Sequence, residues 1–358
     1  MWNIAEFPPK IDIETKEVLK MVNKARTALA ELKGVAESIP NQYLLLNTLV
    51  LQEAKDSSAI ENIITTQDEL FKAELNIEGV QFLAAKEVQN YAIALKRGYE
   101  LIKESTLLTN RTILEIQETL ERNKAGFRKV PGTSLKNNFG QVVYEPPQKN
   151  DEIVSLMNSL ERFINDDEIS DLDDLIKMAL IHFQFESIHP FYDGNGRTGR
   201  IMNVLYLQKQ RLINLPILYL SRYINQNKSD YYRLIQNVRD HENWIDWVKF
   251  MLIAIEKTAI QSIGIVKDLR QLMQVYKEKI RNELPKIYSQ DLLNNLFKHP
   301  YTKIEFIQED LQVGRITATK YLDQLVQIGL LTKYKIGKNS YYVNHALITL
   351  FSQDYTIQ

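Results

Sequence analysis

The sequence contains no cysteine, which excludes a disulfide framework and any metal site built from thiolates. It also lacks an apolar run of the roughly 18–20 residues that a membrane-spanning helix needs. Neither sign of charge dominates, because 44 Lys and Arg face 45 Asp and Glu, so nucleic-acid binding has to be argued from a local patch. The first residues include prolines and acidic side chains and contain no apolar run of the length found in a signal peptide. These absences predict a cytoplasmic protein without a membrane anchor.

The chain of 358 residues, 44% of them hydrophobic, is long enough for two or three domains. Apolar residues recur with a helical period over much of its length, which predicts a mostly α fold. The segments with this period are 12–36, 41–64, 82–104, 109–122 and 150–165. Residues 126–147 break the pattern, because glycine, proline and asparagine surround two short extended pieces. This segment predicts a β-hairpin between helices.

One polar, glycine-rich segment at residues 189–200 reads HPFYDGNGRTGR and lies between two predicted helices. Ser170 and Asp173 have the spacing of a capping box at the start of the first helix. Pro190 should end that helix near Ser187, and helical periodicity resumes after the glycines. The segment is therefore predicted to be a loop that leads into the N-terminus of the second helix.

The residue types in this loop suit phosphate binding. Gly194 and Gly196 allow backbone N–H groups to approach an anion, and the N-terminus of the following helix adds positive potential. Arg197 and Arg200, three residues apart, can lie on one side of that helix and bind separate phosphates. A glycine turn or an arginine pair alone is usually only a loop or a solvated face. Their joint occurrence predicts an anion site.

Two further residues add chemistry to the anion site. Asp193 can hold one Mg²⁺, which commonly binds through one or two carboxylates and substrate phosphates. His189 can accept a proton from an attacking hydroxyl. Positioning, charge neutralisation and a base are the requirements of phosphoryl or nucleotidyl transfer. Because a base needs a neutral imidazole, we expect activity to rise through about pH 6–7.

The loop resembles the Fic (Fido) signature, H-P-F-x-[D/E]-G-N-G-R-x-x-R, and matches it at every defined position. A weaker resemblance extends over roughly residues 40–255. It implies a Fic-type helical bundle with a small β-hairpin flap, divided into an N-terminal helical region at 1–105 and a catalytic core at 106–280. Most Fic proteins move AMP from ATP to a Ser, Thr or Tyr hydroxyl of a protein and release pyrophosphate. Many form homodimers, which is the expectation here.

The resemblance also implies roles for the residues of the loop. His189 would be the general base, and Asp193 would hold Mg²⁺ or Mn²⁺ between the α- and β-phosphates. Gly194, Asn195 and Gly196 would bind these two phosphates, with the Asn195 amide on the α-phosphate. Relatives that act as phosphotransferases carry lysine at the position of Gly196, so glycine there favours AMP transfer.

Further residues are assigned by the same resemblance. Arg197 would contact the β-phosphate of ATP, and Arg200 the γ-phosphate. Tyr231 and Tyr232 resemble an aromatic pair near the adenine, although paired tyrosines are also ordinary core residues. Residues 132–144 would form the flap that aligns an extended segment of the target protein by β-augmentation.

A second motif, SSAIEN at residues 57–62, fits the inhibitory pattern [S/T]-x-x-x-E-[G/N] of the family's second class, through Ser57, Glu61 and Asn62. Ser57 and Glu61 are four residues apart, so the hydroxyl can steady the carboxylate on one helix face. Glu61 could then pair with Arg200 and compete with the γ-phosphate. The alternative is a glutamate in solvent at the end of a helix.

Residues 285–358 predict a separate unit of three helices followed by a two-stranded hairpin around Gly337. This order resembles a winged helix-turn-helix. Residues 313–340 carry a net charge of +4. Their cationic side chains are Arg315, Lys320, Lys333, Lys335 and Lys338. In a DNA-binding unit, the side chains facing the major groove would be Arg315, Thr317, Thr319 and Lys320. Winged helices also mediate protein contacts, so DNA is one possible partner and protein the other.

Three functions remain compatible with the sequence. The leading one is an autoinhibited protein adenylyltransferase that uses ATP and a divalent cation. The second is a DNA-binding regulator in which the Fic core only senses ATP. The third transfers another phosphate-linked group, such as phosphocholine or UMP, through the same loop. His182 and Glu186, four residues apart, are interpreted as helix surface or core and not as a metal site.

Overall fold

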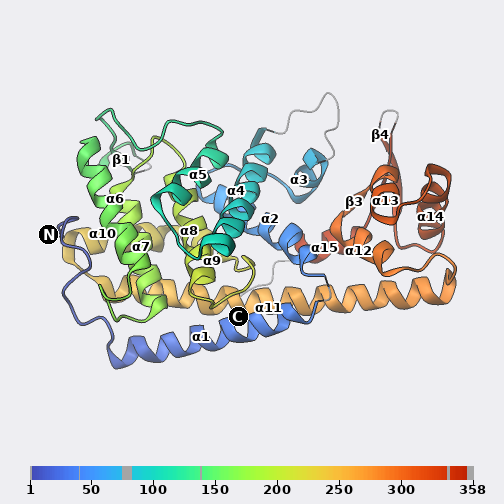
Figure 1. The fold of residues 1–358 in the computed structure, drawn as a ribbon, viewed down its shortest axis with the longest axis horizontal. Helices are drawn as coiled ribbons and strands as arrows, with labels where there is room; N and C mark the ends of the chain where they lie inside the picture. Colours follow the sequence, from blue (N-terminus) through green and yellow to red (C-terminus); the bar gives the residue numbers. More distant parts are fainter. Residues whose placement is uncertain (1, 40, 75–82, 138, 337–338, 353–358) are drawn as a thin grey trace.

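The computed structural model describes residues 2–39, 41–74, 83–137, 139–336 and 339–352. This part of the chain is mostly helical, as predicted, with two small antiparallel sheets. Figure 1 shows an elongated molecule in which a helical body occupies one end and the C-terminal unit the other. No described helix is both long enough and apolar enough to cross a membrane.

The helices fall into two groups, before and after the glycine-rich loop, and the strands are interspersed among them. The helices before the glycine-rich loop are α1 (Lys16–Glu37), α2 (Tyr43–Ile60), α3 (Gln67–Glu74), α4 (Leu83–Ser105), α5 (Asn110–Glu121), α6 (Asn150–Asn165) and α7 (Asp174–Ile188). Those after it are α8 (Asn195–Lys209), α9 (Leu220–Gln226), α10 (Lys228–His241), α11 (Trp244–Glu283), α12 (Gln290–Lys298), α13 (Ile304–Leu311), α14 (Arg315–Gln327) and α15 (His345–Ser352). The strands are β1 (Leu135–Lys136), β2 (Val142–Tyr144), β3 (Tyr301–Thr302), β4 (Thr332–Ile336) and β5 (Asn339–Val343).

The start of α7 differs from the prediction. Asp173 is its N-cap, and its carboxylate accepts a hydrogen bond from the backbone N–H of Leu175 at 2.9 Å. Ser170, the predicted cap, bonds the N–H of Leu172 before the helix begins. The capping-box assignment is therefore wrong, because the aspartate three residues later makes the cap itself.

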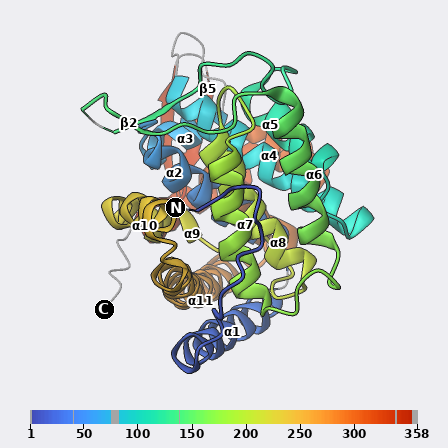
Figure 2. The same ribbon diagram turned by 90° about the vertical axis from the view of Figure 1, so that its left-hand side faces the viewer.

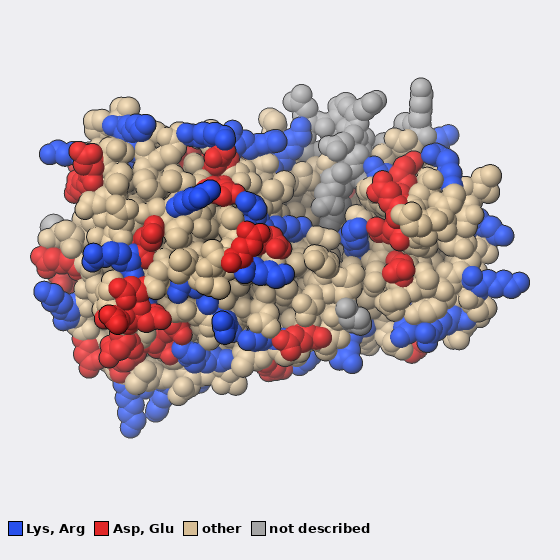
Figure 3. All heavy atoms as spheres, in the orientation of Figure 1, with Lys and Arg blue, Asp and Glu red and all other residues tan. Residues whose placement is uncertain are grey.

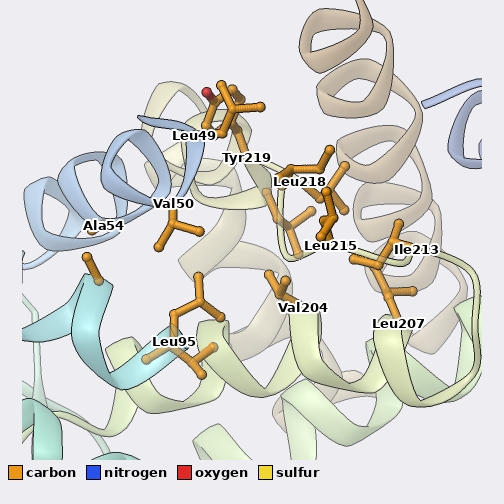
Figure 4. Close-up of a cluster of buried hydrophobic side chains, with 14 of the residues drawn as sticks. Leu49, Val50, Ala54, Leu95, Val204, Leu207, Ile213, Leu215, Leu218 and Tyr219 are labelled. Carbon is orange, nitrogen blue, oxygen red and sulfur yellow. The ribbon is translucent and has the colours of Figure 1, made fainter. Parts of the chain in front are cut away.

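Helices α7 and α8 form the centre of the core, and both are buried on almost every side. Figure 4 shows how the neighbouring elements converge there, with Val50 of α2 directed toward Leu95 of α4 and Val204 of α8, and Leu49 of α2 beside Tyr219. Close-packed side chains of this kind leave a helix little freedom to shift. The loop that joins α7 to α8 is consequently fixed at both ends.

The longest element, α11, spans 40 residues, or about 60 Å at the ~1.5 Å rise of an α-helix. Helix α1 lies along it, and Trp244 and Trp247 near its start are buried in the helical body. Figure 1 shows α11 continuing beneath the C-terminal unit. It therefore joins the two ends of the molecule.

The hairpin predicted between helices is present. Strands β1 and β2 are antiparallel, with Leu135 opposite Tyr144 and Lys136 opposite Val142. Figure 2 shows this hairpin extending away from the helices. Phe139 is 88% exposed at the tip, so the hairpin presents apolar surface to solvent.

In the C-terminal unit, for which a winged helix-turn-helix is predicted, the helices α12, α13 and α14 precede the hairpin of β4 and β5. A three-stranded antiparallel sheet has the order β3-β5-β4, and α13 and α14 lie between β3 and β4 in the chain. The sequence analysis missed the two-residue strand β3 and the final helix α15. Gly337 and Lys338, at the predicted hairpin turn, lie outside the described residues.

The positive charge of this unit is partly neutralised from within. Arg315 is paired with Glu305 at 3.2 Å, and Lys333 with Asp323 at 2.8 Å. Basic and acidic side chains are interspersed over the face seen in Figure 3. DNA binding by this unit stays a prediction.

Two helical glycines allow a direct test of how α4 packs on α8. A methyl group at Gly98 would lie 2.5 Å from Cδ1 of Leu205, whereas one at Gly34 would meet nothing within 4 Å. Gly34→Ala should stabilise the protein by roughly 0.5–1 kcal/mol through helix propensity. Gly98→Ala should lower the free energy of unfolding by about 1–2 kcal/mol, because overpacking outweighs the same gain. Urea denaturation measures both, and equal stabilisation by the two variants would contradict the packing of α4 on α8.

Candidate functional site

The loop between α7 and α8 is closed by its own residues. His189 ends α7 in the left-handed region at φ 49°, and Gly194 precedes α8 at φ 75°. Between them, the Asn195 side chain accepts from the backbone N–H of Phe191 and donates to its carbonyl, both at 2.8 Å. Phe191 is itself buried in the core. The asparagine thus fixes the loop, and its predicted contact with an α-phosphate is left to the remaining Nδ2 hydrogen.

Two cavities adjoin the loop. One, of about 410 Å³, is lined by residues 192–197 together with Glu61 and Glu87. The other, of about 580 Å³, lies between the loop, α10 and the hairpin. Of the predicted site residues, the second cavity is lined by Glu61, Asn62, His189, Gly196, Arg200, Tyr231 and Tyr232. Residues predicted from motifs far apart in the sequence are therefore brought to one place.

The Arg200 side chain is 1% exposed, and its hydrogen bonds to other described residues go to the segment predicted to be inhibitory. Its Nη2 donates to the Glu61 carboxylate at 2.8 Å and to the Ser57 carbonyl at 3.0 Å, and its Nε donates to the Ser57 hydroxyl at 2.8 Å. The expected ion pair between Glu61 and Arg200 is present. The expected role of Ser57 differs, because its hydroxyl binds the arginine that Glu61 also binds.

The pKa of Glu61 reflects this pairing. Burial acts to raise the pKa, but the charge and hydrogen bond of Arg200 act in the opposite direction, and the result is a lowered pKa. Glu61 is thus an anion at neutral pH. A methyl group at Gly196 would lie 2.5 Å from its Oε1, so the carboxylate rests on the glycine of the anion site.

The end of α2 holds Glu61 in place. Asn62 adopts φ 63°, and the N–H groups of Asn62 and Ile63 bond the carbonyls of Ala59 and Ser58 at 3.0 Å. This is a Schellman cap, whose left-handed position takes glycine or asparagine. The choice of glycine or asparagine after the motif's glutamate thereby has a physical reason. Lys228 of α10 also donates to the Ile60 carbonyl at this helix end.

Arg197 is paired with two carboxylates, Glu121 at 2.9 Å and Glu87 at 3.4 Å. A methyl group at Gly194 would lie 2.3 Å from Oε1 of Glu121, so this carboxylate rests against the first glycine of the loop. Sequence reasoning missed both glutamates. Neither belongs to a motif, and only the packing of α4 and α5 on α8 brings them to the arginine.

The pKa of His189 is lowered to about 4, by burial first and then by the nearby Arg128 charge, while the backbone of Glu186 acts the other way. Arg128 is fully buried, and its Nε donates to the His189 carbonyl at 2.8 Å. The imidazole is therefore neutral well below pH 6. The pH 6–7 window expected from an unperturbed histidine is wrong for this environment.

The two tyrosines of α10 have different surroundings. Tyr231 is 2% exposed, bonds Nε2 of His182 at 2.7 Å and packs against Trp247. Tyr232 is 46% exposed and can offer a ring to a ligand. His182 is a core residue, as interpreted from the sequence. Glu186 lines the larger cavity, and burial raises its pKa to about 7.

Asp193 is exposed beside the smaller cavity, and its Oδ1 accepts from the Gly194 N–H at 2.7 Å. Among the described residues, no three His, Asp or Glu side chains are grouped as metal ligands. A single carboxylate beside an anion site fits Mg²⁺, because phosphates and water usually complete its shell.

Three sequence models of known families match the chain. The Fic/DOC family matches residues 107–207, the Fic/DOC family N-terminal region matches 19–100, and the C-terminal domain of SoFic-like protein adenylyltransferases matches 272–347. The three matches together extend over most of the chain.

Individual relatives are more distant. The chain is 25% identical over 203 residues to the protein adenylyltransferase Fic of Drosophila erecta, covering 56% of this chain and 39% of that protein. It is 23% identical over 282 residues to the protein of the same name from Drosophila mojavensis, covering 77% and 51%. The chain thus spans about half or less of the length of these relatives.

Solved structures share the fold. A Fic family protein from Desulfovibrio desulfuricans G20 superposes with a TM-score of 0.60 at 20% identity, covering 94% of this chain and 97% of that one. Fic-1 from C. elegans gives a TM-score of 0.54 at 18% identity, covering 70% and 74%. With its complete loop signature and the three matched regions, the chain belongs to the Fic family.

Proposed function

We propose that this protein is a protein adenylyltransferase, which moves AMP from ATP to a Ser, Thr or Tyr hydroxyl and is held inactive by Glu61. The observation that carries the proposal is the convergence of His189, Gly196 and Arg200 on one cavity beside a projecting hairpin. The names of the Drosophila relatives support AMP transfer in particular. Gly196, where phosphotransferase relatives carry lysine, supports it further.

In the proposed reaction, the target hydroxyl attacks the α-phosphorus of ATP in line with the bond to pyrophosphate. The new O–P bond forms as the bond to pyrophosphate breaks. His189 takes the hydroxyl proton at Nε2, since Nδ1 is buried. Arg197 and Arg200 stabilise the negative charge that leaves with pyrophosphate. Mg²⁺ or Mn²⁺ held by Asp193 would neutralise charge on the phosphates.

The same geometry explains how the protein would be restrained. While Nε and Nη2 of Arg200 are bound to Ser57 and Glu61, a γ-phosphate can reach only Nη1 and cannot form the paired N–H contacts that a free guanidinium offers. ATP would then bind without its triphosphate aligned, which removes the orientation that in-line attack needs. Movement of α2 that withdraws Glu61 would restore it. A partner or a change of oligomeric state could supply that movement.

The first test removes the base. In the Glu61→Gly background, where the restraint is absent, His189→Ala should abolish transfer from α-labelled ATP in the presence of Mg²⁺, because a general base commonly contributes about 10²–10⁴-fold. The label should appear on protein only when His189 is present, and the melting temperature should stay close to that of the unmodified chain. If neither form of the protein becomes labelled while ATP still binds, the ATP-sensor alternative replaces the transferase.

The second test removes the restraint. Glu61→Gly should raise self-labelling by tenfold or more, since about 1.4 kcal/mol of freed γ-phosphate binding corresponds to that factor. Glu61→Gln keeps the length of the side chain and loses its charge, so it should activate as well. Activation by glycine alone would assign the effect to the helix end and not to the ion pair.

The third test uses pH. Because the pKa of His189 is lowered to about 4, its neutral form predominates at every pH above that value. In the Glu61→Gly protein, protonation of His189 should not lower kcat/KM between pH 8 and 5, and kcat/KM should fall only as the pH approaches 4. Circular dichroism over the same range controls for acid unfolding. An acid limb centred at about pH 6.5, the ordinary value for histidine, would contradict the buried environment.

A further inference from the structure

The two carboxylates paired with Arg197 differ in their surroundings. The Arg197 side chain is 6% exposed, that of Glu121 13% and that of Glu87 48%. Glu121 bonds Nη2 of the arginine and Glu87 bonds Nη1. The two terminal nitrogens of one guanidinium are thus bound by one partner that is largely shielded from solvent and one that is half-exposed.

The two carboxylates also differ in their access to the smaller cavity. Among the described residues, the cavity of about 410 Å³ is lined by Arg197 and Glu87 but not by Glu121. Glu121 instead rests against Gly194 at the start of α8. A ligand that enters this cavity meets Glu87 and not Glu121.

Helix α5 supports the loop at a second point. Gln117, one turn before Glu121, donates from Nε2 to the backbone carbonyl of Asp193 at 3.3 Å. Burial raises the pKa of Glu121, and the Arg197 charge opposes that shift. One face of α5 therefore fixes the loop backbone and the arginine side chain together.

We propose that Glu121 is a positioning residue that holds Arg197 in the orientation needed to bind the β-phosphate, and that Glu87 is the partner which a β-phosphate displaces. The inference rests on the proposed function, since it assigns a role within the same nucleotide site.

The donor arrangement of arginine makes this division possible. A guanidinium carries five N–H donors in a fixed plane, so a carboxylate on Nη2 leaves the Nη1 side available. Nε of Arg197 has no hydrogen-bond partner among the described residues. Glu121 can therefore remain bound while a phosphate replaces Glu87. Glu61 differs from Glu121 in this respect, because it lines both cavities and must leave.

The test compares Glu121→Gln with Glu87→Gln, each in the Glu61→Gly background. Dissociation constants for AMP and ADP are measured by isothermal titration calorimetry with Mg²⁺ present. Both substitutions remove one negative charge beside the same arginine, so a general electrostatic gain would tighten ADP binding in both. A positioning role instead gives opposite signs.

We expect Glu121→Gln to weaken ADP binding about tenfold and Glu87→Gln to tighten it about two- to threefold, as expected for loss of an anchor and of a competitor. AMP binding should change less than about twofold in each, because AMP has no β-phosphate. Glu121→Asp, which keeps the charge, should recover part of the lost ADP affinity. Melting temperatures identify any variant that fails to fold. If Glu121→Gln does, Glu121→Asp tests the position through side-chain length instead, with weaker ADP binding and unchanged AMP binding as the expected result.

Three results would overturn the proposal, and the third would overturn the proposed function as well. Tighter ADP binding in Glu121→Gln would make Glu121 a second competitor. Equal weakening of AMP and ADP would assign it a general structural role. Absence of binding by both nucleotides in the Glu61→Gly protein itself would remove the proposed function, and the role of Glu121 with it.

Discussion

The ion pair between Arg200 and Glu61 is the interaction on which the proposed regulation depends. A guanidinium that is 1% exposed needs an anion, and the structure supplies a carboxylate of the same chain at 2.8 Å. A triphosphate is the other anion that could satisfy it. Glu61 and a triphosphate are therefore alternative partners for the buried charge of Arg200. Its response to a signal depends on how firmly α2 holds Glu61.

Several contacts tie α2 to the rest of the body. The buried Glu53 accepts hydrogen bonds from Tyr91 of α4 and from Ser221 of α9, and burial raises its pKa to about 8. Lys228 holds the last turn of the same helix. The proposed restraint is thus integrated into the packing of the core, and a signal that releases Glu61 would have to act on this helix as a whole.

The sequence predicted the mostly helical fold, the hairpin, the loop and the pairing of Glu61 with Arg200, because each leaves a local pattern or a motif. It did not predict the hydroxyl of Ser57 on Arg200, since helical spacing alone places it beside Glu61. The pKa of His189 depends on burial and on Arg128, which lies 61 residues away in the chain. The pairing of Glu87 and Glu121 with Arg197 was not predicted either, because only tertiary packing brings these residues together. Long-range contacts of single side chains carry no sequence signature without related sequences to compare.

The central claim is that Glu61 and a γ-phosphate compete for Arg200. The most direct measurement is the gain in affinity from ADP to ATP, determined by calorimetry in the unmodified protein and in Glu61→Gly. The account predicts that the γ-phosphate adds little affinity while Glu61 is present and a clear gain once it is removed. An equal gain in both proteins would show that Arg200 is not the shared partner.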